Sequence, residues 1–250
     1  MGLSVVIITR NEEKKITECI QSVSFANEII VVDSFSQDQT IETAKRSGAK
    51  VLTRVFDNFS NQKNFAIDQA SEDWILSIDA DERISPELAA SIQNIIQNNE
   101  SPVVGYWLKR DNYLFGKKNR FGRNWNDWQL RLIRKGKGKF TEIIHERIFP
   151  DGITGKLKGS LLHYGFQSDQ DYWKRFEKYT ELEASQIVER EFCPSWFYIH
   201  IRPVAYFIKY YFFLLGFLDG WLGLKDNLLS AYYVYIKNKK ARIKFQKKLK

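Results

Sequence analysis

The sequence predicts an α/β protein in which helices cover both faces of a mostly parallel β-sheet, with a helical extension at the C-terminal end. Two observations predict this fold. Through residues 1–98, short apolar runs alternate with segments whose apolar residues recur at helical spacing. In addition, the run 74–78 is almost entirely large and apolar, as in a strand buried on both faces. Because crossovers between parallel strands are right-handed, this alternation predicts one sheet with helices on both faces.

The first 98 residues are expected to contain four strands and four helices. The expected strands are residues 3–8, 28–32, 50–53 and 74–78. Asn11 and Asp38 are the expected N-caps of the first two helices, and residues 61–70 form the third. Ser85 caps the fourth helix, with Pro86 at its first position.

The pattern changes beyond residue 98. Short strands are expected among Gly-rich, basic and aromatic loops, at residues 103–109, 129–134, 143–149 and 157–162. From Asp169 the chain becomes helical again and dense in aromatic residues. We therefore expect one domain over residues 1–165 and a helical, aromatic-rich extension with a basic tail over residues 166–250.

A cluster of carboxylates follows the buried run 74–78. Asp79 and Asp81 stand one residue apart at the carboxyl end of the expected strand, the edge at which open α/β sheets bind ligands. Two such aspartates can share Mg²⁺ or Mn²⁺, which also accept phosphate oxygens as ligands. The alternative is a solvated acidic turn. Asp33 follows another strand in the same way, whereas no glycine-rich dinucleotide or P-loop motif is present.

The charge of the chain is concentrated at its end. The formal net charge is +8, and residues 237–250 contain eight Lys or Arg and no Asp or Glu. The remainder therefore has 38 − 8 = 30 basic residues against 30 acidic ones, so no nucleic-acid-binding body is expected. With two cysteines and a strand expected within three residues of the start, we expect a cytoplasmic protein without a signal peptide.

The segment 203–224 is almost entirely apolar. Lys209 and Asp219 interrupt it, and the uninterrupted part, residues 210–218, is shorter than the roughly 20 residues of a membrane-spanning helix. Its Tyr and Trp residues and the basic tail are typical of attachment to the surface of an anionic membrane. We expect peripheral attachment to the inner face of the cell membrane. The alternative is a helical pair packed on the domain or in a homodimer interface.

Several stretches of the chain resemble a known family. Residues 5–12 (VVIITRNE), 30–40 (IVVDSFSQDQT) and 77–81 (SIDAD) resemble family 2 glycosyltransferases with the GT-A fold, a Rossmann-like fold of nucleotide-diphospho-sugar transferases. Later pieces are similar to the branch of lipopolysaccharide-core glucosyltransferase-like enzymes; they are residues 62–64 (QKN), 130–132 (LRL), 145–146 (HE), 162–164 (LHY) and 216–220 (GFLDG).

The resemblance implies an activity and a division of the domain. A sugar would move, with inversion, from a nucleotide sugar, most often UDP-linked, to a hydroxyl of a lipid-linked or lipopolysaccharide-type acceptor. Residues 1–98 would form the nucleotide-binding half of the GT-A domain and residues 103–165 the acceptor half. The competing interpretation is a non-catalytic sugar-nucleotide-binding or scaffold protein of the same fold. A sugar-1-phosphate nucleotidyltransferase is disfavoured because its Gly-rich opening loop is absent.

The resemblance also implies the residues that bind the nucleoside. Asp33 would accept a hydrogen bond from the base. Thr9, Asn11 and Glu12 would line the nucleoside pocket, and Arg10 and Ser34 would also bind the nucleotide sugar. The family usually has glycine where this chain has Phe35, and a bulky residue disfavours positive φ. A different turn is therefore expected after Asp33.

The diphosphate accumulates negative charge as it leaves. The resemblance implies that Asp79 and Asp81 hold the ribose and the metal ion, and that His163 is a further metal ligand. Lys63 or Arg10 would help to neutralise the leaving group. For Lys63 the alternative is a solvated surface lysine.

The acceptor hydroxyl needs a general base. We favour Glu146 over Asp127 for this role, and Glu142 lacks a motif. Indole rings stack well on sugars, and we expect an acceptor cleft that includes Trp125, Trp128 and His145. Trp107 fits a core position of the added strands equally well.

Overall fold

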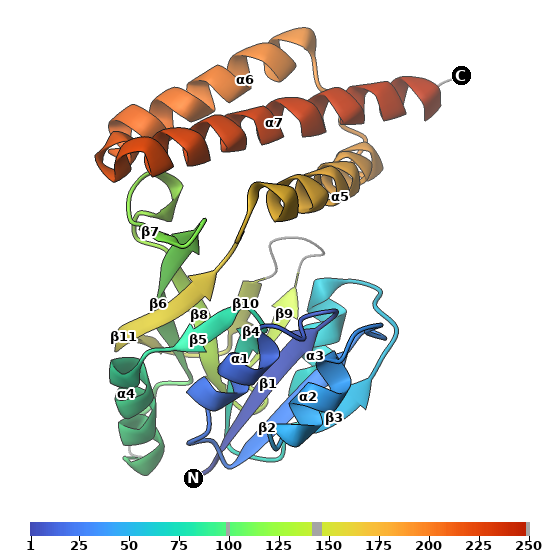
Figure 1. The fold of residues 1–250 in the computed structure, drawn as a ribbon. Coiled ribbons are helices and arrows are strands. Elements are labelled where there is room, and N and C mark those ends of the chain that lie inside the picture. Colours follow the sequence, from blue (N-terminus) through green and yellow to red (C-terminus); the bar gives the residue numbers. More distant parts are fainter. Residues whose placement is uncertain (99–100, 142–146, 249–250) are drawn as a thin grey trace. The chain divides into compact units, whose positions relative to one another are not determined.

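The computed structural model describes residues 1–98, 101–141 and 147–248 (Figure 1). The chain divides into two compact units. The first comprises residues 1–111 and 128–163, and the second comprises residues 112–127 and 164–250. This division differs from the expected one at residue 165, because residues 112–127 group with the C-terminal helices. Each unit is described by itself.

The first unit begins with alternating strands and helices, as predicted. Its elements up to residue 97 are β1 (Leu3–Thr9), α1 (Ile16–Ser22), β2 (Glu28–Asp33), α2 (Thr40–Arg46), β3 (Lys50–Thr53), α3 (Phe59–Asp68), β4 (Trp74–Asp79), β5 (Glu82–Ile84) and α4 (Pro86–Gln97). The remaining strands are β6 (Gly105–Leu114), β8 (Trp128–Arg134), β9 (Gly138–Thr141), β10 (Arg147–Pro150) and β11 (Thr154–Tyr164).

The main sheet has the strand order β3-β2-β1-β4-β8-β6-β11-β5 in the described part of the chain. The neighbours β3, β2, β1 and β4 are parallel, which confirms the expectation for residues 1–98. Strand β8 is antiparallel to β4 and to β6, and β5 is antiparallel to β11. The sheet is therefore mixed as a whole, with its parallel part in the N-terminal half. Strands β9 and β10 pair in a separate ribbon, and part of the expected strand 143–149 lies outside the described residues.

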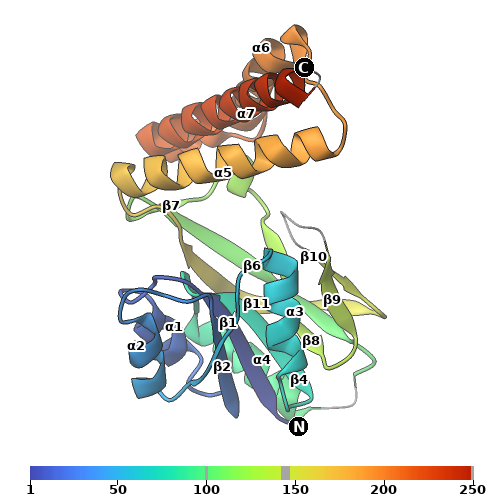
Figure 2. The ribbon, with the colours of Figure 1, turned by 90° about the vertical axis from the view of Figure 1, so that its right-hand side faces the viewer.

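The central strands are buried on both faces, as their unbroken apolar runs predicted. Alternate side chains of a strand point to opposite faces, and Leu3, Val5 and Ile7 join one hydrophobic cluster while Val6 joins the other. The first cluster includes residues of α1, α2 and α4, and the second includes residues of α3. Helices thus cover both faces of the sheet, as Figure 2 shows from the side.

The caps of the helices follow the predictions in part. Ser85 accepts a hydrogen bond from the backbone N–H of Leu88, and Pro86 is the first residue of α4, as predicted. The prediction for Asn11 was wrong, because α1 begins only at Ile16. Asn11 has a φ of 56° and its side chain accepts a hydrogen bond from Gln37 instead, so it joins two loops rather than capping a helix.

The second unit consists mainly of helices. They are α5 (Asp169–Glu189), α6 (Trp196–Ile208), a π-turn η2 (Lys209–Phe213), a 3₁₀ turn η3 (Gly216–Asp219) and α7 (Gly220–Lys248). From residues 112–127 it includes strand β7 (Lys117–Asn119), which pairs with the end of β6, and the 3₁₀ turn η1 (Gly122–Asn124). Helix α7 packs against both α5 and α6 (Figures 1 and 2).

The expected basic tail is the end of helix α7. Asn238 and Ala241 are buried there. Three lysines of the tail pair with glutamates of α5: Lys237 with Glu183, Lys240 with Glu177 and Glu181, and Lys244 with Glu181. Three of the eight basic residues of the expected tail are therefore paired with carboxylates within the unit.

No single helix among the described residues is both long and apolar enough to cross a membrane. Segments Trp196–Phe213 and Gly216–Lys248, which are bent by 73° at the turn between them, meet the length and composition test only as a pair.

Candidate active site

The carboxyl ends of β1, β2 and β4 meet at one edge of the sheet. In the parallel register, Thr9 of β1 lies opposite Asp33 of β2, and Ile8 of β1 lies opposite Asp79 of β4. The polar residues that end these strands are thus neighbours, as their positions in the sequence predicted. This edge is the usual ligand edge of an open α/β sheet.

The segments after β1 and β2 are joined by hydrogen bonds from backbone N–H groups to side-chain oxygens. The N–H of Asn11 donates to the hydroxyl of Ser36 at 2.7 Å, and the N–H of Gln37 donates to Asn11 Oδ1 at 2.8 Å. The N–H of Glu12 donates to the hydroxyl of Thr40 at 2.8 Å. These reciprocal hydrogen bonds hold the two loops in a fixed arrangement next to Asp33.

Asp33 is fully buried at the end of β2. Its carboxylate accepts hydrogen bonds from the backbone N–H of Ser36 at 2.7 Å and from the hydroxyl of Ser36 at 2.5 Å. The expectation of a different turn at Phe35 was wrong, because Phe35 has a φ of 57° in the left-handed region that glycine favours. Phe35 is 54% exposed, so packing around its ring does not oppose this conformation, whose cost is the close approach of the Cβ to the backbone.

Helix α3 presents three consecutive side chains to three different strands or loops. Gln62 donates to the hydroxyl of Ser34 at 3.0 Å. The ammonium of Lys63 lies 2.9 Å from Asp79 Oδ1, and its side chain is 1% exposed. Asn64 exchanges two hydrogen bonds of 2.8 Å with the backbone of Phe140 in β9. The alternative of a solvated surface lysine at position 63 was therefore wrong.

Asp79 lies between two cations. In addition to Lys63, the guanidinium of Arg131 lies 3.0 Å from Asp79 Oδ2. Burial alone would raise the pKa of Asp79, but the charges of Lys63 and Arg131 outweigh it and hold the pKa of this carboxyl well below its usual value. Asp79 is thus held in its charged form with a fixed orientation, and 30% of its side chain remains exposed.

Two further residues of this cluster, Glu82 and Arg131, were not predicted as site residues. Glu82 is fully buried; it accepts a hydrogen bond from the backbone N–H of Asp79 at 2.9 Å and lies 3.3 Å from Arg131. The signal in the sequence was an arginine inside an apolar strand, in Leu130-Arg131-Leu132. A buried arginine needs a carboxylate partner, and no local pattern shows which one.

Hydrogen bonds from Arg83 join the turn after β4 to the start of α1. Arg83 is buried and donates to the carbonyls of Ala80 at 2.8 Å and of Lys15 at 2.6 Å. These hydrogen bonds fix the chain between Asp79 and Glu82, and therefore the direction in which Asp81 leaves the strand.

Asp81 and His163 lie close together. His163 Nε2 is 3.9 Å from Asp81 Oδ2, although 82 positions separate the two residues in the sequence. His163 lies opposite Glu82 in the register of β11 and β5, which brings it to the acidic turn. Within residues 1–98, 101–141 and 147–248, no group of three or more His, Cys, Asp or Glu side chains is arranged to hold a metal ion.

The residues predicted for the acceptor lie in different parts of the chain. Glu142, His145 and Glu146 lie outside the described residues. Trp128, in the first unit, carries the ammonium of Lys156 over its ring at 4.6 Å.

Asp127 and Trp125 belong to the second unit. The carboxylate of Asp127 accepts a hydrogen bond from Asn112 at 3.0 Å, and the ring of Trp125 stacks on Phe121. Trp107, in the first unit, donates to the hydroxyl of Thr154 at 3.1 Å and is half-buried.

The chain is similar in sequence to known glycosyltransferases. The model of the family described as glycosyl transferase family 2 matches residues 4–152. The lipopolysaccharide core biosynthesis glycosyltransferase LpsC of Rhizobium meliloti is 32% identical, over 94% of this chain and 92% of that protein. An uncharacterized glycosyltransferase of Rickettsia typhi is 30% identical, over 96% of this chain and 86% of that protein.

A solved structure with a similar fold region is glucosyl-3-phosphoglycerate synthase of Mycobacterium tuberculosis, in complex with Mn²⁺, uridine diphosphate and glucosyl-3-phosphoglycerate. The identity is 24%, the TM-score is 0.37, and the match covers 45% of this chain and 44% of that one.

The chain has a mixed α/β sheet whose parallel strands end in polar residues at one edge. The chain belongs to glycosyl transferase family 2. It is a glycosyltransferase that uses a nucleotide sugar.

Proposed function

We propose that this enzyme transfers a sugar, with inversion and with the help of Mg²⁺ or Mn²⁺, from a UDP-linked donor to a hydroxyl of a lipid-linked or lipopolysaccharide-type acceptor. The observation that carries the proposal is the convergence of Asp33, Asp79 and Asp81 with two buried cations at one edge of the sheet. A buried carboxylate at the end of β2 suits the donor groups of a base, and cations beside Asp79 suit a diphosphate.

The donor end of the site is built to stabilise a leaving diphosphate. Lys63 is positioned by its ion pair with Asp79 and by the ring of Phe140, which lies 5.2 Å from its ammonium. Such a preorganised cation stabilises charge that develops in the transition state without further reorganisation. Arg131 supplies a second positive charge on the other side of Asp79.

The residues at the acidic turn fit a divalent ion in part. Asp81 and His163 would hold the ion, because their oxygen and nitrogen atoms lie close together and both are partly exposed. A hard divalent ion bound by one or two carboxylates takes its remaining ligands from substrate phosphates and water. Such an ion would supply Lewis-acid stabilisation of the leaving diphosphate.

The acceptor hydroxyl must lose a proton as its oxygen attacks the anomeric carbon from the face opposite the diphosphate. We propose that Glu146 is the general base that accepts this proton, with Asp127 as the alternative base. Trp125, Trp128 and His145 would contact the acceptor. Inversion follows because the nucleoside diphosphate leaves in the same step, and no sugar–enzyme bond forms.

The acceptor class rests on similarity to LpsC, whose name places it in lipopolysaccharide core biosynthesis. A lipid-linked acceptor calls for an enzyme at the inner face of the cell membrane. The exposed aromatic side chains of the second unit support peripheral attachment there, and a homodimer interface is the alternative use of the same side chains.

The test is a screen of nucleotide sugars with purified protein, Mg²⁺ or Mn²⁺, and glycolipid acceptors. We expect nucleoside diphosphate to be released from one UDP-sugar, and the product to have the opposite anomeric configuration to the donor. Saturable nucleotide binding with no transfer from any donor would favour the non-catalytic alternative.

A further inference from the structure

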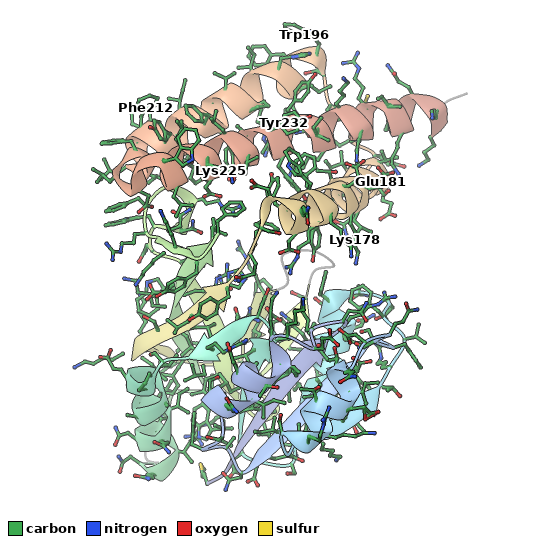
Figure 3. All side chains as sticks on the ribbon, in the orientation of Figure 1. Lys178, Glu181, Trp196, Phe212, Lys225 and Tyr232 are labelled. Carbon is green, nitrogen blue, oxygen red and sulfur yellow. The ribbon has the colours of Figure 1, made fainter. Side chains whose placement is uncertain are left out.

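Helix α6 and the turn after it carry an apolar face that the second unit does not cover. The exposed residues of this face recur every three or four positions, which places them on one side of the helix; they are Phe197, Ile201, Val204, Ile208 and Phe212. Ile199 and Pro203 are buried in the unit. Figure 3 shows Trp196 and Phe212 near the two ends of this segment.

The two most exposed large apolar side chains of the described residues lie at or beside the turn between α6 and α7. Phe213 is 78% exposed and Trp221 is 76% exposed, and Leu215, Phe217 and Leu218 lie between them in the chain. Contiguous exposed apolar surface of this kind marks an interaction site, because isolated soluble domains cover most of it.

Close backbone packing and a hydrogen bond fix the conformation of this turn, in which these side chains are exposed. A Cβ on Gly216 would lie 2.7 Å from the carbonyl oxygen of Tyr210, and one on Gly223 would lie 1.9 Å from that of Gly216. Only glycine allows the backbone to approach so closely. Leu215 has a φ of 58°, which costs energy for a residue with a side chain. The neighbouring carbonyl of Leu214 accepts a hydrogen bond from Gly122 at 2.9 Å.

A basic segment from another part of the sequence is hydrogen-bonded to this turn. Asp219 accepts hydrogen bonds from the backbone N–H groups of Arg120 at 2.8 Å and Phe121 at 2.7 Å. Residues 117–123 include four cations, Lys117, Lys118, Arg120 and Arg123. Arg123 is further held by Asp226 at 3.5 Å.

The charge around the apolar turn is therefore positive. Residues 112–127 and 196–224 together contain six Lys or Arg and two Asp. Both aspartates are engaged by the unit itself, Asp219 as described and Asp127 through Asn112. Lys117, Arg120 and Lys209 are exposed.

We propose that residues 117–123 and 209–221, together called the anchor tip, bind the surface of an anionic bilayer. This inference rests on the proposed membrane location and specifies the residues that make the contact. The apolar side chains would enter the boundary between headgroups and acyl chains, and the cations of loop 117–123 would lie among the lipid phosphates. The end of α7 is the weaker candidate, since Lys237, Lys240 and Lys244 pair with glutamates of α5.

The test is co-sedimentation of the full chain with phosphatidylcholine vesicles, with and without phosphatidylglycerol, across a salt series. Lys117→Gln/Arg120→Gln should weaken binding to the anionic vesicles at low salt by about thirtyfold, the size expected for two cations at such a surface. Phe213→Asp/Leu218→Asp should remove binding to both kinds of vesicle. The matched control is Lys247→Gln/Lys248→Gln, which removes the same charge from the end of α7 and should change binding by less than about twofold.

The outcomes separate this proposal from others. Equal loss in the Lys247→Gln/Lys248→Gln control would move the site to the end of α7 and overturn the proposal. A wild-type chain that ignores anionic vesicles, yet is a dimer that Phe213→Asp/Leu218→Asp converts to a monomer, would make the face an interface between two copies. Because the vesicle assay contains no donor, its failure leaves the proposed transfer reaction to be judged by nucleoside diphosphate release.

Discussion

The ammonium of Lys63 lies 2.9 Å from the carboxylate of Asp79, and the elements that carry the two residues fix both groups in position. Lys63 comes from a helix on one face of the sheet and Asp79 from the end of a central strand. Arg131, which pairs with the other oxygen of Asp79, is itself held by buried Glu82. The pair therefore fixes the position of the Lys63 ammonium at the ligand edge of the sheet before any substrate binds.

Replacing Lys63 tests this relationship. We expect Lys63→Met to lower kcat by about 100-fold or more, the typical effect of losing one preorganised group that stabilises the transition state. Loss of the partner should also cost about 1 to 3 kcal/mol in the free energy of unfolding. Steady-state kinetics and urea unfolding measure the two effects. Lys139→Met is the matched control, because Lys139 is 68% exposed; equal effects in both variants would contradict a specific role for Lys63.

Replacing Asp81 tests the proposed role of the metal ion. Asp81→Ala should abolish transfer and remove the dependence of nucleotide binding on Mg²⁺ or Mn²⁺, since the ion that neutralises the diphosphate loses a carboxylate ligand. EDTA should inactivate the wild-type enzyme in the same assay. Asp68→Ala, which removes an exposed carboxylate of α3, should leave both properties unchanged. Normal turnover of Asp81→Ala, together with normal turnover of the wild type in EDTA, would remove the metal from the mechanism.

The identity of the base is tested by isosteric amides. Glu146→Gln should retain donor binding and lose transfer by about 10² to 10⁴-fold, because the amide keeps the shape and cannot accept the proton. Asp127→Asn should have a smaller effect. Both are measured as nucleoside diphosphate release with a saturating acceptor. The reverse order of effects would assign the base to Asp127.

The lowered pKa of Glu28 predicts a pH dependence of stability. Burial alone would raise the pKa of Glu28, but hydrogen bonds from Ser4 and Ser71 outweigh it and place the pKa below its usual value of 4.5. A depressed pKa stabilises the folded state fully above the pKa of the unfolded chain, and this contribution declines as pH falls through the folded pKa. Wild type should therefore exceed Glu28→Gln in stability at pH 7 and 5.

That advantage should shrink below about pH 4. Urea unfolding of both proteins between pH 7 and pH 3 measures it. An advantage that is the same at every pH would show that the Glu28 carboxylate does not titrate differently in the folded state.

The parallel half of the fold was predictable because its signals are local. Unbroken apolar runs gave the strands, and Asp33 and Asp79 could be placed at one edge because parallel strands bring their carboxyl ends together. The interactions between distant segments were not predictable. Arg131 meets Asp79 across 52 positions of the chain, and the loop at Arg120 meets Asp219 across 99. The positive φ of Phe35 was missed because average preferences disfavour this conformation for a bulky residue, and no local pattern in the sequence indicates the exception.

The central claim is that the donor nucleotide binds where β1, β2 and β4 end, and calorimetric titration with UDP tests it most directly. We expect UDP to bind wild type more tightly with Mn²⁺ than without it. Asp33→Ala should weaken binding in both conditions, because its proposed contact is to the base, and it should raise KM for the donor more than it lowers kcat. Unchanged UDP affinity in Asp33→Ala, measured on a variant that unfolds as wild type does, would place the nucleotide elsewhere and contradict the account.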